Sequence, residues 1–513
     1  MRSSKFAFSL GLFIALTAAA AGVPSTGYGQ TKELTASEQS YREARRAVDA
    51  GILAYGGLDA LRTIENFTIR HEGFTVHRNQ SRRADAPYER TPLSGTLIVE
   101  QRRNRLYHDN KGSYPGGFNW HWGLMTNGKD AARVTYLERR INSTAALPPQ
   151  VMRGRLRWLP HNLLLSALER ATHLRSLGRA NFNNRPHDVV TYATEDGAQF
   201  TLYLDAQTHL VSKFEGLGTD PYFGDSVQEI IFPGYRAVDK FQVPTARVTK
   251  IMGEVVEEIP FVEVSFNKTY PDEQFKAPEG FTPPAAPVQS QPQNKLADNV
   301  YMISAGGYNV LAVGFKDHVM VVETPGGDNT SRDVIARVKE LMPGKPIKYA
   351  AVTHHHDDHA GGVRTYIAEG ATVITTPGLR AFFERVAAAR NFTFQPDALA
   401  RSPRPLQIET LQNGKRIFTD GTQTVELYDI GSGPHMDEMI VAYLPQQKII
   451  FQGDLLNRPE DGHIAPGNAT TAHFAGWLKK SGLAVERIVG VHGPVSTLDD
   501  LNKAVALMQQ AQN

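Results

Sequence analysis

The chain has 513 residues, too many for one hydrophobic core, so we expect two or three domains. Hydrophobic residues make up 41% and charged residues 21%, which excludes a mostly disordered chain. The 55 Lys and Arg nearly balance the 53 Asp and Glu, so nothing draws the protein toward nucleic acid. The chain has no cysteine, which excludes disulfides, thiolate ligands and thiol nucleophiles. Any metal must therefore be held by His, Asp or Glu.

Residues 1–21 have the pattern of a cleaved export signal. Arg2 and Lys5 precede an apolar run from Phe6 to Ala21, which ends in small residues and is too short to span a membrane comfortably. We expect a mature chain that begins near Gly22, has no transmembrane span and is periplasmic or secreted. A membrane anchor made of the same run is the alternative.

Residues 35–276 predict an N-terminal α+β domain. Thr35 and Glu38 have the spacing of a capping box before a helix that ends at Gly56. A second helix is expected from Val151 to about Leu177, and Asp196-Gly197 marks a hairpin connection. The mixture predicts a mostly antiparallel β half-barrel with helices. Alternating segments predict its strands at 67–69, 96–100, 189–192, 200–204, 246–251 and 261–266.

The run LYLDAQTHLVSKFEG, followed by FPGYRAVDKFQVPTARV, resembles the curved sheet of periplasmic lipoprotein carriers. This resemblance covers roughly residues 35–278. An aromatic cluster in the same part is formed by Tyr114, Phe118, Trp120 and Trp122. It predicts either a surface for an apolar ligand or ordinary packing, and both interpretations stay open.

Residues 277–294, APEGFTPPAAPVQSQPQN, predict a Pro/Gln-rich linker, because such a composition cannot bury a core. The C-terminal domain would then span 295–513. We expect strands at 301–303, 309–313, 318–323 and 347–352, with a helix at 331–342 whose apolar residues share one face.

A cluster of metal-binding side chains follows the last of these strands directly. Four nitrogen or oxygen donors lie within six residues, and they are His354, His356, Asp358 and His359. His354 and His356 point the same way and can hold one metal, while Asp358 and His359 can hold another. A solvated histidine-rich loop is the alternative interpretation.

The pattern His354-x-His356-x-Asp358-His359 resembles the H-x-H-x-D-H signature of the metallo-β-lactamase superfamily. Later segments fit the remaining ligands in the same order: Gly433-Pro434-His435, then Gly453-Asp454, then His492-Gly493. The resemblance covers about residues 299–510 and implies a four-layer αββα sandwich. It implies a first metal site of His354, His356 and His435, a second site of Asp358, His359 and His492, and Asp454 as the bridge.

The resemblance also implies the chemistry. We expect two Zn²⁺ ions, with iron or manganese as alternatives, because every donor is nitrogen or oxygen. Two such ions lie about 3.5–4 Å apart and supply a hydroxide that attacks a carbonyl. Asp358 would orient this hydroxide and so be the catalytic residue. Family members of the best-known lactamase type have a Cys ligand that this chain lacks, and Glu323 stands where the family usually has Asp.

Three functions compete at this point. The first is an exported binuclear zinc hydrolase that uses a metal-bound hydroxide to cleave an ester, lactone, thioester or amide of a small-molecule substrate. The second is a β-lactamase proper. The third is a periplasmic protein that binds an apolar ligand and has a subordinate metal domain. Substrate selection is expected from the stretch 377–405, where four phenylalanines could form an apolar wall: Phe382, Phe383, Phe392 and Phe394. Packing of Phe382 and Phe383 within a helix is the alternative.

Overall fold

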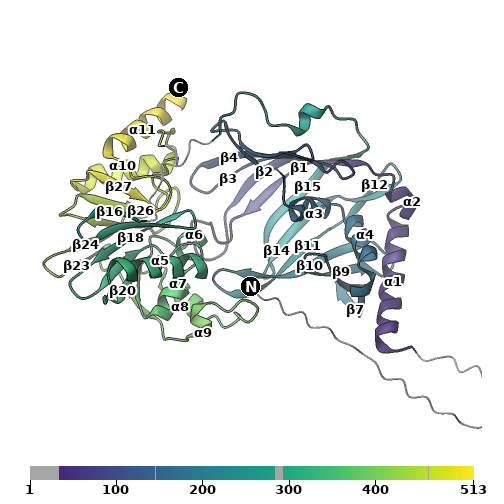
Figure 1. Cartoon of the computed structure of the whole chain (residues 1–513), viewed down its shortest axis with the longest axis horizontal. Helices are drawn as coiled ribbons and strands as arrows, with labels where there is room; N and C mark the ends of the chain where they lie inside the picture. The colour runs from purple at the N-terminus through teal and green to yellow at the C-terminus, as the bar shows by residue number, and fades with distance from the viewer. Residues whose placement is uncertain (1–33, 145, 284–292, 460–461, 513) are drawn as a thin grey trace, which may run out of the picture.

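The computed structural model describes residues 34–144, 146–283, 293–459 and 462–512. Two sheet-rich parts lie side by side, one purple to teal and one green to yellow (Figure 1). The predicted export signal and half of the predicted linker, residues 284–292, lie outside the described residues. Within the described residues, no helix has the length and apolar character needed to cross a membrane.

The N-terminal part is one large antiparallel sheet of 13 strands within the described residues, in the order β6-β5-β4-β3-β2-β1-β15-β14-β11-β10-β9-β8-β7. This confirms the expected antiparallel sheet, while the half-barrel shape stays a prediction. Its strands are β1 Asn66–Val76, β2 Arg90–Glu100, β3 Arg105–Tyr114, β4 Phe118–Thr126, β5 Ala131–Thr135, β6 Arg140–Thr144, β7 Arg175–Phe182, β8 Arg185–Ala193, β9 Gln199–Asp205, β10 Val211–Asp220, β11 Gly224–Ile231, β14 Ala246–Ile251 and β15 Glu254–Phe266.

A small ribbon and several short helices complete this part. The ribbon pairs β12 Tyr235–Val238 with β13 Phe241–Pro244. The capping box of Thr35 and Glu38 starts the first helix as predicted. The helices are α1 Ala36–Ala54, α2 Leu58–Leu61, α3 Pro149–Leu156, α4 His161–Glu169 and the 3₁₀ turns Ala171–His173 and Asp272–Phe275.

The single long helix expected from Val151 to about Leu177 is wrong. Two short helices, α3 and α4, replace it, and β7 already begins at Arg175. Pro160 precedes α4 directly, and a proline cannot donate the backbone hydrogen bond that a continuous helix would need there. Pro160 is itself the sequence signal for this break, because proline is the least favourable residue in a helix interior.

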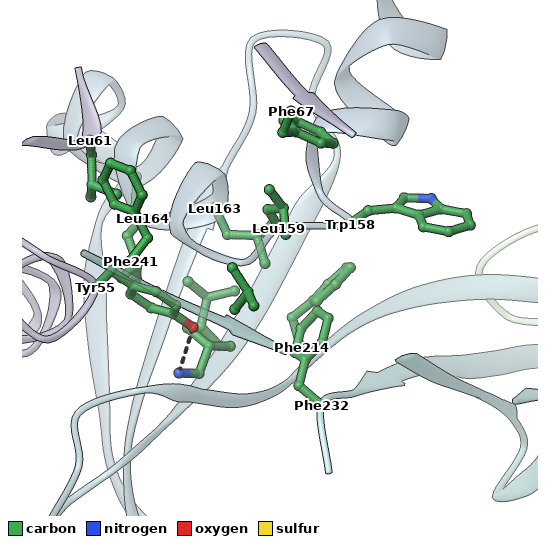
Figure 2. Packing of buried hydrophobic residues seen from close by; sticks show 14 of the residues in the cluster. Tyr55, Leu61, Phe67, Trp158, Leu159, Leu163, Leu164, Phe214, Phe232 and Phe241 are labelled. Atoms are coloured by element: carbon green, nitrogen blue, oxygen red, sulfur yellow. Dashed lines mark hydrogen bonds between the residues drawn. The ribbon is translucent and has the colours of Figure 1, made fainter. Parts of the chain in front are cut away.

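The core of the N-terminal part lies between these helices and one face of the sheet. Leu159, Leu163 and Leu164 are fully buried and pack with Phe67, Phe214 and other apolar residues from distant strands (Figure 2). Tyr55 at the end of α1 is also fully buried, and its hydroxyl accepts a hydrogen bond from the backbone N–H of Val211 at 3.2 Å. The helices α3 and α4 therefore pack against this face of the sheet, as Figure 1 shows.

The C-terminal part holds two further sheets, mixed in strand direction. The first contains β16 Gln293–Ala297, β17 Val300–Ala305, β18 Tyr308–Gly314, β19 Val319–Val322, β20 Ile347–Ala351, β21 Thr372–Thr375 and β22 Gln407–Thr410. The second contains β23 Lys415–Thr419, β24 Thr424–Asp429, β25 Ile440–Leu444, β26 Ile449–Gln452 and β27 Arg487–Gly490. Because Gln293 and Asn294 pair with Ile303 and Met302 in β17, the ordered sheet begins two residues inside the predicted linker.

Helices cover the outer face of each sheet. They are α5 Asp328–Leu341, α6 Asp357–Ala360, α7 Val363–Glu369, α8 Arg380–Ala388, α9 Ala398–Arg401, α10 Ala469–Ser481 and α11 Leu498–Gln512. One apolar cluster joins the inner faces of the two sheets, a second joins the first sheet to α5 and α7, and a third joins the second sheet to α10 and α11. These four layers confirm the expected αββα sandwich.

Candidate metal centre

The candidate ligands lie where strands of the sandwich end. His354 and His356 follow β20, and Asp358 and His359 begin the short helix α6. Asp454 follows β26 and His492 follows β27, its parallel neighbour. Since parallel strands end at the same edge of a sheet, residues far apart in sequence meet there. His435 reaches this edge from the loop between β24 and β25.

The side chains form two groups that share one carboxylate. The first group is His354, His356, His435 and Asp454, and the second is Asp358, His359, Asp454 and His492. Within each group, one ligand atom from every residue lies within 4.8 Å of all the others. The geometry thus brings together all seven residues expected from the sequence, in the expected division. Their role as ligands stays a prediction.

Asp454 is the junction of the two groups. Its Oδ2 atom lies 3.0 Å from His359 Nε2 and 3.4 Å from His435 Nε2, and its Oδ1 atom lies 3.3 Å from His492 Nε2. Its backbone has a φ of +59°, a left-handed conformation that Asp adopts more readily than most residues. The turn after β26 therefore aims this carboxylate at both groups.

The ring nitrogens have the pattern that a metal site requires. His356 Nε2 lies 3.0 Å from the carbonyl oxygen of Ser81, so it carries the proton and leaves Nδ1 as the free acceptor. His356 Nδ1, His354 Nε2 and both nitrogens of His435 are buried without a hydrogen-bond partner in the described residues. Buried polar atoms are rarely left unpaired, so these lone pairs fit a cation between them.

Charge in the cluster is also suited to a cation. Burial lowers the pKa of His354 and His356 well below the usual value, so both rings are neutral. Burial alone would raise the pKa of Asp454, but His359 beside it holds that pKa well below its usual range. Neutral imidazoles and ionised carboxylates are the ligand forms of these side chains.

His359 behaves differently from the other rings. Burial opposes its protonation, yet Asp454 and Asp358 raise its pKa well above the usual value. The ring also faces Glu323, whose Oε1 atom lies 3.7 Å from His359 Nδ1. Glu323 is fully buried at a φ of +91°, beside the metal loop where the sequence predicted a supporting carboxylate. A bound cation would replace the proton that His359 holds beside Asp358 and Asp454.

The N-terminal part contributes directly to this centre. Besides Ser81, the loop between β1 and β2 supplies Gln80, whose amide donates to Asp357 Oδ1 at 2.6 Å and to Asp358 Oδ1 at 2.8 Å. The Phe118 ring at the start of β4 packs 5.2 Å from the ring of His435. Gly116 in the same hairpin is close enough that a Cβ atom there would lie 3.0 Å from His435 Cα.

Sequence reasoning missed these supporting residues. Gln80 and Ser81 lie 277 and 275 residues before the side chains they contact, and neither belongs to a motif. Phe118 was noticed as part of an aromatic cluster, but not as a neighbour of the metal loop. No local signal marks such residues, because only the packing of the two parts brings them to the site.

Two further features of the C-terminal part bear on the site. His355 is in neither ligand group, and its ring packs 5.7 Å from Phe382 instead. Of the two alternatives for the stretch 377–405, the structure has helix packing: Phe382 and Phe383 are buried in a cluster around α8, and Phe392 is buried as well. Phe394 alone is exposed among these four, and it lies against a cavity of the N-terminal part.

Gln80→Ala should weaken binding of the second zinc ion by about 10–100-fold while sparing the first. The amide of Gln80 fixes the Asp358 carboxylate, and its loss leaves that ligand free to turn away from His359 and His492. Competition with a chromogenic chelator measures both affinities. Arg83→Ala removes an exposed side chain from the same loop and is the matched control. Equal second-site affinities in wild type and Gln80→Ala would contradict the prediction.

Comparison with known families supports the assignment of this fold. The model of the metallo-beta-lactamase superfamily matches residues 303–492, a range that contains every candidate ligand. The C-terminal domain belongs to the metallo-β-lactamase superfamily. No statement about the N-terminal part follows from this match, because it lies outside the matched range.

Individual relatives of this metallo-β-lactamase domain are distant. A metallo-beta-lactamase type 2 from Elizabethkingia meningoseptica is 21% identical over 221 residues, which cover 42% of this chain and 80% of the relative. Among solved structures, a metallo-beta-lactamase from Pontibacter korlensis is 23% identical and covers 42% of this chain and 98% of its own, with a TM-score of 0.32. FIM-1 from Pseudomonas aeruginosa, in its mono-zinc form, is 22% identical and covers 43% and 95%, with a TM-score of 0.31.

Proposed function

We propose that the protein is an exported, metal-dependent hydrolase that binds two zinc ions and cleaves an ester, lactone, thioester or amide. The observation that carries this proposal is the meeting of two four-residue ligand groups at the shared carboxylate of Asp454. All donors are nitrogen or oxygen, a set that suits zinc and leaves iron and manganese as alternatives. When bound, such ions supply an activated water and polarise the carbonyl of the substrate.

Asp358 is the residue placed to handle the proton of the attacking water. Burial alone would raise its pKa, but His359 and His492 lower it, so the carboxylate is ionised at neutral pH. Its Oδ1 atom is held by Gln80, while Oδ2 lies 3.5 Å from His492 Nε2 and 3.6 Å from His359 Nε2. A carboxylate held in one orientation in this way can accept the proton of the attacking water.

The surroundings of the centre bear on the substrate. Phe118 packs beside His435, and the ring of Tyr308 packs 5.5 Å from that of His492. Tyr114, half exposed, lies near enough to Asp358 and Asp357 that burial and these carboxylates raise its pKa. These aromatic rings favour a substrate with an apolar portion next to the scissile carbonyl.

A β-lactamase proper is the second candidate function, because the named relatives are metallo-beta-lactamases. One observation separates the two candidates in favour of the first. The chain has no cysteine, so its second ligand group lacks the thiolate that the best-known lactamase type has among its ligands. A chromogenic β-lactam assay decides between them.

The test is a hydrolysis screen of the full chain across β-lactams, lactones, thioesters and carboxylic esters. We expect turnover of at least one non-lactam class, loss of that turnover after treatment with a chelator, and its return on addition of zinc. Metal analysis by mass spectrometry should give two zinc ions per chain. Turnover that survives complete removal of metal would overturn the proposal, and so would a protein that binds no zinc.

A further inference from the structure

A large cavity lies in the N-terminal part, away from the metal centre. Its volume is about 1060 Å³, and none of the candidate metal ligands lines it. The segment 154–158 forms one side, and strands β3, β4, β9, β10, β11, β14 and β15 form the others. A cavity of this size lies at the upper end of the range for small-molecule sites.

Two of the three arginines that line this cavity have no ion pair in the described residues. Each of its three carboxylates already has a cation: Asp196 lies 2.8 Å from Arg153, Glu215 lies 2.8 Å from Lys213, and Glu257 lies 3.2 Å from Arg247. Two further arginines line the cavity, Arg155 and Arg157. Neither has a carboxylate within ion-pair distance in the described part of the chain.

Partial burial makes the charged form of both guanidinium groups less favourable. Burial is the main cause that lowers the pKa of each guanidinium, although both stay charged at neutral pH. Both side chains are half-buried, and the carboxylates that act on them, Glu257 and Asp196, are already paired with Arg247 and Arg153. A partly desolvated guanidinium without an ion pair of its own favours an anion beside it, and the cavity has room for one anionic group.

His108 belongs to the same wall and orients Arg155. Arg155 Nε donates to His108 Nδ1 at 3.0 Å, and because arginine has no acceptor, the proton of the neutral imidazole sits on Nε2. Burial, with Arg155 next, holds the pKa of His108 well below its usual value, which agrees with a neutral ring. His108 is 2% exposed, and its Nε2 atom has no partner in the described residues.

The remaining walls are largely aromatic and aliphatic. Arg157 lies 4.3 Å over the ring of Phe200, and Arg247 lies 4.8 Å over the ring of Trp158. Stacking of this kind orients a guanidinium so that its N–H edge stays available to an oxyanion. The other apolar lining residues include Trp122, Phe214, Ile230 and Ile259, together with Phe394 from the C-terminal part.

We propose that this cavity binds an amphipathic anion, a molecule with one carboxylate or phosphate group and an apolar body. Arg155 and Arg157 hold the anionic group, and His108 fixes the guanidinium of Arg155 by accepting a hydrogen bond from its Nε. The apolar body packs against the rings of Trp122, Trp158 and Phe200. The site is independent of the metal centre, so its occupancy does not require hydrolysis or bound zinc.

Binding to the full chain tests this directly, with four probes that share a ten-carbon chain: decanoate, decyl phosphate, decyltrimethylammonium and decanol, all below their micelle concentrations. Isothermal titration calorimetry gives affinity and stoichiometry, and tryptophan fluorescence reports on Trp122 and Trp158. We expect one anion per chain, at least tenfold tighter than the cationic or neutral probe. The tighter of the carboxylate and phosphate probes identifies the head group.

Variants locate the site. Arg157→Met should weaken binding of the anion by about 10–100-fold, the effect of losing one charge-assisted hydrogen bond. Arg155→Met should do the same, and Arg157→Met decides alone if Arg155→Met does not fold. Arg179→Met, on β7 of the same sheet but 69% exposed and paired with Asp188, should leave affinity unchanged. Equal affinity for all four probes, no binding, or unchanged binding in Arg157→Met would overturn the proposal.

Discussion

Replacing Asp454 with Ala should leave about one zinc ion per chain and lower the hydrolytic rate by about 10²–10³-fold. The first group keeps three histidines without this carboxylate, namely His354, His356 and His435. The second group keeps Asp358, His359 and His492, but it loses the carboxylate that lies against two of its rings. The second ion should therefore be lost first.

Backbone conformation needs a separate control in this experiment. Asp454 has a φ of +59°, which Ala adopts less readily than Asp or Asn, so part of any effect of Asp454→Ala is local strain. Asp454→Asn keeps the backbone preference and removes only the charge. Both variants should show the same loss of the second ion by mass spectrometry.

A substitution of His355 tests whether the zinc content depends on which histidine of the metal loop is removed. His355 lies between two candidate ligands in sequence but belongs to neither group, so His355→Leu should keep both zinc ions. A histidine-rich loop without defined sites would give the reverse result, because each lost histidine would reduce the metal content slightly and the distant Asp454 would have no effect. Equal zinc content in wild type and Asp454→Asn would exclude the binuclear site.

Arg364→Ala should lower the free energy of unfolding of the C-terminal domain by about 3–5 kcal/mol. The Arg364 guanidinium is 3% exposed, and its Nε atom lies 2.5 Å from Asp397 Oδ2. It also donates to the carbonyl oxygen of Val386 at 2.7 Å and lies 3.9 Å over the ring of Phe392. Removing it leaves a buried carboxylate without a cation and the end of α8 without a donor.

The measurement is urea unfolding followed by circular dichroism, with Arg332→Ala as the control. Arg332 is 58% exposed and lies 3.8 Å from Asp328, so its loss should change stability by no more than about 1 kcal/mol. Arg364→Met with Asp397→Leu removes both charges and should recover much of the stability, since an apolar pair can replace a buried ion pair. A loss below 1 kcal/mol in Arg364→Ala would refute the prediction.

The local sequence pattern predicted the strands of the C-terminal sandwich better than those of the large N-terminal sheet. The strands around His354 are short, apolar and bounded by Gly or Pro, so their positions followed from composition alone. In the N-terminal part, strands such as β3 and β7 are rich in polar residues and were missed. Their strand state comes from pairing, β3 with β2 and β4 and β7 with β8, which single-residue propensity does not record.

The sequence by itself determined the donor chemistry of this protein. It has no cysteine, and its histidines and aspartates stand in the order of the metallo-β-lactamase signature, a resemblance that implies both ligand groups. Only the tertiary structure decided what surrounds them. Gln80 and Ser81 reach the metal loop, and Arg155 and Arg157 reach one cavity, through contacts between segments far apart in the chain. Such contacts depend on how sheets and loops pack, and no local sequence pattern encodes them.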